Sequence, residues 1–329
     1  MNSQQIGVIV AQLGTPDAPT AAALRPYLRQ FLSDRRVIDY PSWLWQVVLH
    51  GAILRTRPKR SARLYQRVWM PEGSPLRVHS DAQVAGLQAR LGDRYRVVLG
   101  MTYGTPGIPH AVASLEAQGI ERIVVLPMYP QYSSTTTAPI YDAVTRAAGT
   151  PKKRTYPALR FIAPFYDHPA YIASMRRHLL AAIRDRETPP DVFVISFHGI
   201  PARYVHTGDP YRAQCERTAR LLADAMHWRD DQWQIAFQSR FGPEAWLEPY
   251  TDQVIEKLAR GNGGRILVFS PGFTTDCLET LDELGNEGRE AFVQAGGHEH
   301  NFHLAACLNA NPDWLDALAE LIVDNSWRS

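Results

Sequence analysis

The alternation of short apolar runs with longer amphipathic segments is the feature that most constrains the fold of this chain. Continuous apolar runs such as IVVL at 123–126, VFVISF at 192–197 and ILVF at 266–269 are typical of parallel strands that helices cover on both faces. Eight such segments are predicted strands: Ile6–Ala11, Tyr95–Gly100, Arg122–Leu126, Leu159–Ile162, Val192–Phe197, Gln234–Gln238, Arg265–Phe269 and Phe302–Cys307. Helical periodicity predicts helices between them, including Ala21–Leu32, Ser80–Leu91, Tyr171–Arg184, Ala213–Met226 and Pro312–Ile322. The pattern predicts an α/β protein with doubly wound, Rossmann-like parallel sheets.

An internal similarity indicates that the chain contains two related halves. LEAQGIERIVVLPMYP at 115–130 and KLARGNGGRILVFSPGF at 257–273 share a helix end, a glycine, an apolar strand and a proline-containing loop. The chain has 329 residues, and a domain holds roughly 150. We therefore expect an N-terminal Rossmann-like half over 1–175 and a C-terminal half over 176–329, facing a central cleft, with the helix from Tyr171 as the crossover.

Composition excludes several classes of function. Lys and Arg number 35 against 33 for Asp and Glu, so the chain carries no global positive field for nucleic acid. Three cysteines without CxxC spacing exclude a disulfide scaffold and favour a reducing compartment. No GxGxxG or GxxxxGK[ST] nucleotide fingerprint is present. The N-terminus predicts a first strand rather than a signal peptide, so we expect a soluble, cytoplasmic protein without a nucleic-acid partner.

One histidine follows a predicted strand at a point where ligands commonly bind. In SFHGIP, His198 lies at the carboxyl end of the fifth strand, the edge at which open α/β sheets hold their ligands. A neutral imidazole there acts as a base or a metal ligand. A histidine satisfied by backbone groups in the core is the alternative, and it is the more common meaning of a single histidine.

Three glutamates form a regular column in the segment DCLETLDELGNEGREAF. Glu279, Glu283 and Glu287 are spaced i, i+4 and i+8, so a helix N-capped by Asp276 places them on one face. A solvated acidic surface is the usual meaning of such a run, but Arg289 is the only cation before the helix ends. If the column begins inside a site and ends in solvent, repulsion and burial raise the pKa values of its inner carboxyl groups.

Aromatic residues follow several other strands. Tyr103, Tyr129, Tyr132 and Trp246 are structural when each is considered alone, but together at strand ends they suggest a flat, apolar ligand. His298, His300 and His303 resemble a metal site in spacing, yet no further ligand adjoins them, so we interpret them as a solvated loop.

With these loops taken together, the chain resembles the ferrochelatases, the enzymes that insert ferrous iron into a porphyrin at the end of haem synthesis. The resemblance runs in order over nearly the whole chain: LGTPDAPT, FLSDRRVID, GSPLRVHS, YPQYSSTTT, SFHGIP, GDPY, QSRFG, PGFTTDCLETLDE and LNANP. It implies two Rossmann-like halves and a lyase that converts protoporphyrin IX and Fe²⁺ into protohaem. Coproporphyrin ferrochelatase, cobalt chelatase and a non-catalytic tetrapyrrole carrier remain alternatives, although a carrier has no need of a column of like charges.

The resemblance also implies roles for individual residues. The family's essential histidine corresponds to His198 and its essential glutamate to Glu279, both expected to act in catalysis and as ligands of the metal. Its further acidic column corresponds to Glu283 and Glu287, expected to relay protons to solvent. Residues expected to contact the porphyrin are Leu13, Arg55, Tyr103, Tyr129 and Trp246.

Some positions depart from the family pattern. A pocket arginine of some members is replaced by Thr102, the usual asparagine before LGTP by Gln12, and the usual proline of LSDPR by Arg35. Ser134 stands at one of the four cysteine positions of members that carry an iron–sulfur cluster. We therefore expect no iron–sulfur cluster and no cofactor beyond the substrate Fe²⁺.

The segment SWLWQVVLHGAIL at 42–54, followed by basic Arg55–Arg60, predicts a helix beside the porphyrin site. Leu49, Ile53 and Leu54 are candidate core residues. Trp43 and Trp45 are two residues apart and cannot both face one core from a helix, so at least one is expected to be exposed or to touch ligand. Tryptophans beside cations are typical of a segment that rests in a membrane interface, and we expect peripheral membrane contact here.

Overall fold

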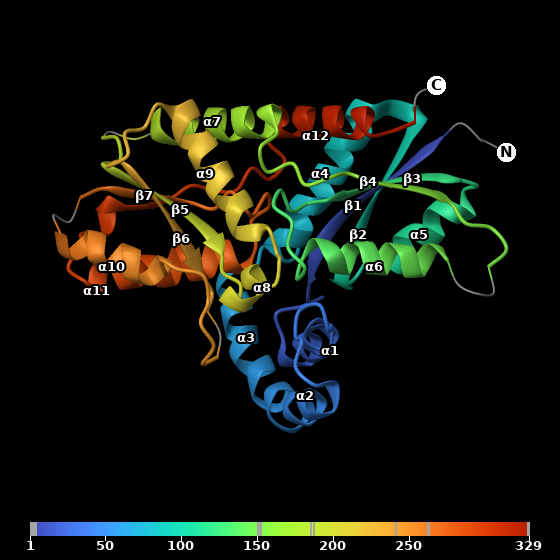
Figure 1. Cartoon of the computed structure of the whole chain (residues 1–329), viewed down its shortest axis with the longest axis horizontal. Helices are drawn as coiled ribbons and strands as arrows, with labels where there is room; N and C mark the ends of the chain where they lie inside the picture. The colour runs from blue at the N-terminus through green and yellow to red at the C-terminus, as the bar shows by residue number, and fades with distance from the viewer. Residues whose placement is uncertain are drawn as a thin grey trace. The chain divides into compact units, whose positions relative to one another are not determined.

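The computed structural model describes residues 5–149, 153–184, 186, 188–240, 242–261 and 264–327. The chain forms two compact units (Figure 1). The first unit comprises residues 1–129, 133–163 and 310–329, and the second comprises residues 130–132 and 164–309.

The first unit is built on a parallel sheet of four strands in the order β2-β1-β3-β4. The strands are β1 (Ile6–Thr15), β2 (Tyr95–Gly104), β3 (Arg122–Pro127) and β4 (Ala158–Phe161). Ile9 of β1 pairs with Val98 on one side and Val125 on the other. Helices α5 (Ile108–Ala117) and α6 (Thr137–Ala148) pack against each other and close a core that includes Ile9 and Val125.

The second unit repeats this topology with the sheet order β6-β5-β7-β8. Its strands are β5 (Val192–His198), β6 (Trp233–Gln238), β7 (Ile266–Phe269) and β8 (Phe302–Leu304). Helices α7 (Pro169–Arg184) and α9 (Tyr211–Met226) pack together, as do α10 (Thr251–Gly261) and α11 (Gly288–Gln294) on the opposite face (Figure 1). In both sheets the first strand lies between the second and the third, so the internal similarity seen in the sequence corresponds to a structural repeat.

All eight predicted strands are present, and the largest differences lie at their ends. Strands β1 and β2 each continue four residues beyond the predicted end because they pair in register as far as Thr15 and Gly104. Strand β8 stops at Leu304, three residues early. Helix α4 begins at Pro75 instead of Ser80, since the Ser74 hydroxyl caps it by accepting a hydrogen bond from the Arg77 N–H at 3.3 Å.

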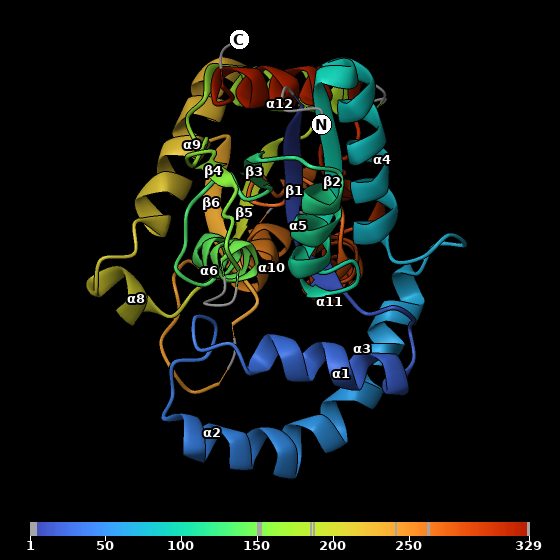
Figure 2. The same ribbon diagram turned by 90° about the vertical axis from the view of Figure 1, so that its right-hand side faces the viewer.

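A group of helices follows β1 in the first unit (Figure 2). It comprises α1 (Ala21–Leu32), α2 (Ser42–Val48), a short π-helical turn η1 (Leu49–Ile53) and α3 (Leu54–Val68). Leu49 and Leu54 are buried as predicted, and Ile53 is half-buried. Trp43 is 75% exposed, whereas the Trp45 indole donates a hydrogen bond to the Leu32 carbonyl at 2.6 Å. The prediction that at least one of the two tryptophans is exposed or touches ligand is therefore confirmed by Trp43.

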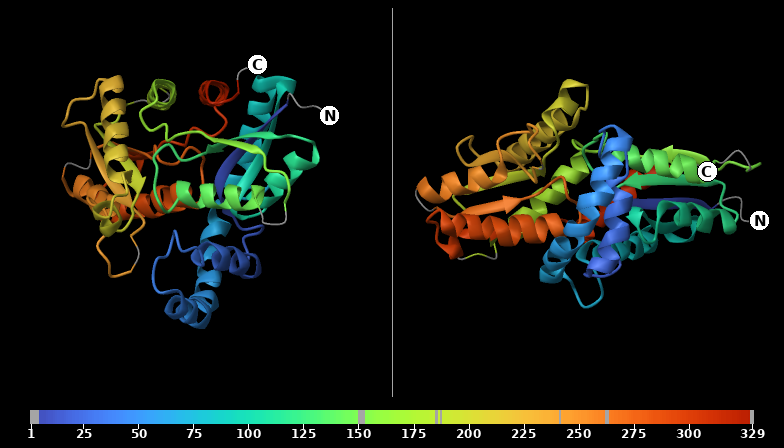
Figure 3. Two further views of the ribbon diagram at one scale, coloured as in Figure 1. Left: turned by 45° about the vertical axis from the view of Figure 1, so that its right-hand side comes forward. Right: turned by 90° about the horizontal axis from the view of Figure 1, so that it is seen from below.

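Helix α12 (Pro312–Asp324) belongs to the first unit, whereas the sequence-based division at 175 placed it with the second. It packs on α4 (Pro75–Leu91) (Figures 2 and 3). Arg90 of α4 is paired with Asp316 of α12 at 2.5 Å. Gly86 of α4 makes this contact close, because a Cβ atom there would lie 2.5 Å from Cδ1 of Leu315. Sequence periodicity predicts the helix but not the partner on which its apolar face packs.

The remaining short elements connect these layers. They are η2 (Gly92–Arg94), α8 (Ala202–His206), the π-helix η3 (Glu279–Glu287) and the 3₁₀ turn η4 (Glu299–Asn301). Within the described ranges no helix combines the length and the apolar character needed to cross a membrane.

Candidate active site

His198 is the last residue of β5, and its imidazole is fixed in one tautomer by the turn that follows. Nδ1 lies 2.6 Å from the carbonyl oxygen of Gly199. A carbonyl only accepts hydrogen bonds, so Nδ1 carries the proton and Nε2 keeps its lone pair. The turn requires glycine, since a Cβ atom on Gly199 would lie 2.9 Å from the Gln238 carbonyl oxygen and 3.2 Å from Cε3 of Trp246.

Aromatic rings surround this imidazole. The ring centroids of Trp246 and Phe273 lie 6.4 Å and 6.2 Å from that of His198. Burial lowers the pKa of His198 below its ordinary value, and the Glu279 carboxylate and the hydrogen bond to Gly199 only partly oppose this effect. Because the ordinary value is 6.5, the imidazole is neutral at pH 7 and available as a base or a ligand. Phe273 was not among the predicted site residues, although it lies in the PGFTTDCLETLDE motif.

The predicted acidic column is present, but the segment that carries it is a π-helix and not an α-helix. Glu279, Glu283 and Glu287 all belong to η3, and the Gly288 N–H donates to the Glu283 carbonyl in the i→i+5 pattern. Residues four apart remain on one face of this wider helix. π-Helical segments occur frequently at functional sites.

The prediction that Asp276 caps this helix was wrong. Its carboxylate accepts hydrogen bonds from the Thr280 hydroxyl at 3.1 Å, the Cys307 N–H at 3.2 Å and the Asn309 side-chain amide at 2.6 Å. Buried Asp276 thus ties the start of η3 to the chain after β8. Cys307 and Asn309 lie 31 and 33 residues away in sequence, so local patterns do not reveal these two contacts.

Glu283 is the carboxyl group whose proton affinity the fold changes most clearly in this column. Burial, and then the neighbouring Glu279 carboxylate, raise the pKa of Glu283 from 4.5 to about 7. The Ser239 hydroxyl donates to its Oε2 atom and the Gln238 amide lies 3.4 Å from the same oxygen, which limits the rise. Gln238 and Ser239 were not among the predicted site residues, although polar residues at the carboxyl end of a buried strand are a usable signal.

Exposure increases along the column as predicted. Glu279 and Glu283 are half-buried, whereas Glu287 is exposed to solvent. Ser239 adopts a left-handed backbone conformation with φ of 68°, which is uncommon for a residue other than glycine and occurs often at functional sites. The column therefore connects the surroundings of Glu279 to solvent through a group that titrates near neutrality.

The first unit holds the other predicted contacts and a cavity of about 1460 Å³. Tyr103 lines this cavity, but Leu13, Arg55 and Tyr129 are not among its lining residues. Arg55 is exposed on α3, and Leu13 and Tyr129 are half-buried. Of these four residues, only Tyr103 therefore lines this cavity.

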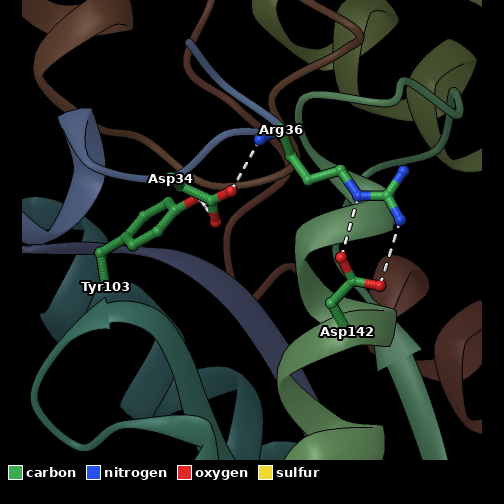
Figure 4. Close-up of polar contacts among 4 residues, drawn as sticks. All are labelled: Asp34, Arg36, Tyr103 and Asp142. Carbon is green, nitrogen blue, oxygen red and sulfur yellow. Dashed lines mark hydrogen bonds and ion pairs between the residues drawn. The ribbon is translucent and has the colours of Figure 1, made fainter. Parts of the chain in front are cut away.

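Tyr103 is held by a polar network that the sequence analysis did not find (Figure 4). Its hydroxyl donates to Oδ2 of Asp34 at 2.8 Å, and burial together with that carboxylate raises the tyrosine pKa. Two residues later, Arg36 binds Asp142 of α6 through two hydrogen bonds of 2.9 and 3.2 Å. Tyr103 is only 3% exposed, and its hydroxyl holds the loop that contains Asp34 and Arg36.

Metal-binding capacity is limited within the described part of the chain. His198 and Glu279 supply two potential ligands, and no group of three or more His, Cys, Asp or Glu side chains is arranged to hold a metal ion there. Two protein ligands leave coordination positions of the metal open, which suits a substrate ion that passes through the site better than a permanently bound structural ion.

Comparison with known proteins identifies the family. The family model described as Ferrochelatase matches residues 5–326. The chain belongs to the ferrochelatase family. The ferrochelatase of Azoarcus sp. (strain BH72) is 47% identical over 322 residues, covering 96% of this chain and 86% of that protein. The ferrochelatase of Alcanivorax borkumensis is 46% identical over 329 residues, covering 99% and 95%.

Solved structures confirm the fold of this ferrochelatase family member at much lower sequence identity. SirB from Bacillus subtilis with Fe³⁺ has a TM-score of 0.58 at 13% identity, over 98% of this chain and 96% of SirB. The sirohydrochlorin chelatase SirB from Bacillus subtilis subspecies spizizenii, in complex with cobalt, gives 0.57 at 11% identity over 98% and 95%. The likeness shows the two-half α/β architecture, and the ferrochelatase assignment itself depends on the sequence matches.

Proposed function

We propose that this protein inserts Fe²⁺ into protoporphyrin IX and releases protohaem, the last step of haem biosynthesis. The observation that carries the proposal is a neutral imidazole at His198 beside a carboxylate column whose middle member, Glu283, titrates near pH 7. Metal insertion removes two protons from pyrrole N–H groups while a divalent cation arrives. A base and a proton path to solvent are the protein groups that this reaction requires.

His198 is assigned as the first proton acceptor or as a ligand of the incoming iron. Its Nδ1–H is engaged by Gly199, so only Nε2 is available for either role. Glu279 is its charged partner, because its carboxylate opposes the effect of burial on the histidine. Imidazole and carboxylate are both suitable ligands for Fe²⁺.

Glu283 and Glu287 are assigned as the route by which protons leave. A pKa of about 7 lets Glu283 accept and release a proton at physiological pH with little cost in either direction. Exposed Glu287 then exchanges protons with water. The network of Ser239 and Gln238 holds the middle carboxyl group in place.

The porphyrin is assigned to aromatic and basic residues. Trp246 and Phe273 present rings beside His198, and a macrocycle bent against such rings directs its nitrogen lone pairs toward a metal. Leu13, Tyr129 and Arg55 stay predicted porphyrin contacts, with Arg55 as a counter-ion for a propionate. The proposal includes no iron–sulfur cluster, because Ser134 stands at one of the four positions that hold cysteine in members with a cluster.

Peripheral membrane contact and a cytoplasmic location complete the proposal. Trp43, Leu44 and Val47 of α2 are exposed large hydrophobic residues, and exposed Arg55, Lys59 and Arg60 follow on α3. Exposed apolar side chains next to cations bind the interface of an anionic bilayer. Such contact gives a poorly water-soluble substrate a direct route to the protein.

A spectrophotometric assay of the purified protein tests the activity. We expect Fe²⁺ and protoporphyrin IX to give the haem spectrum under anaerobic conditions, with coproporphyrin III and Co²⁺ as parallel substrates. His198→Ala should reduce turnover at least 10³-fold, which is on the order of the effect of losing an essential base. The variant protein should still bind porphyrin, as measured by quenching of porphyrin fluorescence. Near-normal turnover of a folded His198→Ala variant would disprove the role of this residue, and faster turnover of coproporphyrin would change the assigned substrate.

A further inference from the structure

A second cavity lies in the second unit and shares no lining residue with the candidate active site. It has a volume of about 490 Å³ and is lined by Arg186, Arg289, Glu299, His300, Phe302, His303 and Leu304. These residues come from the turn after α7, from α11, from η4 and from β8. Cavities of this size hold small organic ligands.

Positive charge dominates the walls of this cavity. The two guanidinium groups of Arg186 and Arg289 line it together with a single carboxylate, that of Glu299. The imidazoles of His300 and His303 complete the polar lining. Neither arginine forms an ion pair with a carboxylate among the residues that the structure describes. Arg289 instead covers the Phe302 ring at 5.2 Å and approaches the Phe302 carbonyl oxygen at 3.4 Å.

Arg186 contains a buried donor that no described residue satisfies. Its Nε atom is buried without a hydrogen-bond partner within the described part of the chain. A buried guanidinium nitrogen without an acceptor is costly, and such groups are rare enough in folded proteins to need an explanation. An anionic ligand in the cavity that accepts a hydrogen bond from Nε would explain this unsatisfied donor.

The electrostatic field inside the cavity also favours an anion. Burial lowers the pKa of His303, and the positive charges of Arg186, Arg289 and His300 lower it further. Burial lowers the pKa of Arg186 as well. A bound anion would remove these unfavourable interactions and raise the pKa of His303 again.

The scaffold holds the arginine beside β8. On α7, His178 Nε2 lies 2.8 Å from the carbonyl oxygen of Ala306, just beyond β8, and its ring packs near Phe269 of β7. Arg186 follows eight residues later, beyond the end of α7 at Arg184. The lining disfavours a metal ion as occupant, because guanidinium groups repel cations.

We propose that this cavity binds a phosphate-class oxyanion, either free phosphate or the phosphate group of a small ester, through the guanidinium groups of Arg186 and Arg289. Planar guanidinium groups match phosphate oxygens through paired hydrogen bonds. Phosphate has its second pKa near 6, so it carries close to two negative charges at pH 7 and balances both arginines. His303 and His300 supply further imidazole nitrogens to the same oxyanion.

Titration with inorganic phosphate, followed by calorimetry and by NMR of the His303 imidazole, tests this proposal. Chloride at equal ionic strength is the reference. We expect saturable phosphate binding that raises the His303 pKa by about one unit. Arg186→Gln and Arg289→Gln should each weaken binding tenfold or more, because each removes charge-assisted hydrogen bonds.

Matched variants separate this effect from general loss of charge or structure. Arg212→Gln removes a paired surface arginine of α9 and should leave phosphate binding unchanged. Arg289→Lys, which keeps the charge, should bind more tightly than Arg289→Gln. A parallel titration with glycerol 3-phosphate distinguishes the two forms of the ligand. Tighter binding of this ester indicates a small phosphorylated ligand, whereas tighter binding of inorganic phosphate indicates the free ion. The absence of saturable binding, or equal binding by the wild type and both glutamine variants, would overturn the proposal.

Discussion

At the scale of single residues, the fold controls the proton affinities of two groups in opposite ways. Burial lowers the pKa of the imidazole at His198 and raises that of the carboxyl group at Glu283. Both shifts favour the neutral form, as expected where low-dielectric surroundings disfavour charge. The histidine is therefore a free base at pH 7, and the carboxyl group is about half protonated. Two groups thus become suited to proton transfer at the same pH.

Glu283 should make the stability of the protein depend on pH. Its folded-state pKa of about 7 lies above the ordinary 4.5, so the folded chain holds this proton more tightly than the unfolded chain. The contribution of this bound proton to the free energy of unfolding is fully present below pH 4.5 and is lost as the pH rises through 7. Between pH 5 and pH 8, the free energy of unfolding of the wild type should therefore fall by on the order of 2 kcal/mol more than that of Glu283→Gln.

Urea unfolding at pH 5 and pH 8 measures this difference. Glu320→Gln, at an exposed position of α12, is the control and should follow the wild-type pH dependence. If Glu283→Gln lost stability between pH 5 and pH 8 as steeply as the wild type, the raised pKa would be refuted.

At the scale of elements, η3 is the helix whose geometry matters most for the proposed chemistry. Its i→i+5 hydrogen bonding keeps the three glutamates on one face while exposure rises toward Glu287. The conformation brings like charges together, which is unfavourable by itself, and the contacts of Asp276 and Ser239 at its flanks hold it in place.

The column should show a gradient of functional importance. Glu279→Gln removes the charged partner of His198, and we expect turnover to fall at least 10²-fold. Glu287→Gln should slow turnover less than tenfold, because water replaces an exposed carboxylate as proton acceptor. Steady-state haem formation by both variants checks this, with porphyrin affinity as the control for folding. Equal losses at both positions would contradict the relay and favour a static acidic site.

Helix α2 allows a matched test of membrane contact. Trp43 is largely exposed, while the Trp45 indole is bonded to the Leu32 carbonyl. Trp43→Ser should lower binding to anionic liposomes with little change in melting temperature. Trp45→Ser should lower the unfolding free energy by about 2 kcal/mol, since it loses packing and a hydrogen bond. Liposome flotation and thermal unfolding give the two readouts, and a large drop in melting temperature for Trp43→Ser would place this side chain in the core instead.

At the scale of the whole molecule, the two units repeat one topology but do not divide the chain at a single point. Residues 310–329 return to the first unit, where α12 covers α4. Leu315 is buried in this contact, directly opposite Gly86. The first unit therefore lacks part of its core until the end of the chain has been added.

Leu315→Ala should lower the unfolding free energy by about 2–4 kcal/mol, the usual cost of emptying a buried leucine site. Glu320→Ala, on the exposed side of the same helix, should change it by less than about 0.5 kcal/mol. Denaturant unfolding measures both values, and hydrogen exchange of α4 amides should rise only in the Leu315 variant. Unchanged exchange in α4 would show that α12 does not stabilise that helix.

The sequence alone determined the local elements and pointed to the family. Strand and helix periodicities depend on neighbouring residues, so all eight strands and the main helices were predictable, as was the position of His198 at the end of β5. The order of loops was sufficient to suggest the family. The spacing of Glu279, Glu283 and Glu287 was visible in the same way, because four-residue spacing is a local property.

Only the tertiary structure decided what depends on contacts distant in sequence. Ser239 and Gln238 contact Glu283, and Asp276 is bonded to Cys307 and Asn309, so these hydrogen bonds join segments that are far apart along the chain. They flank η3, whose π-helical form the residue spacing did not predict. The docking of α12 on α4 is of the same kind. Such contacts set burial, and burial in turn sets the pKa values that make these residue types chemically useful.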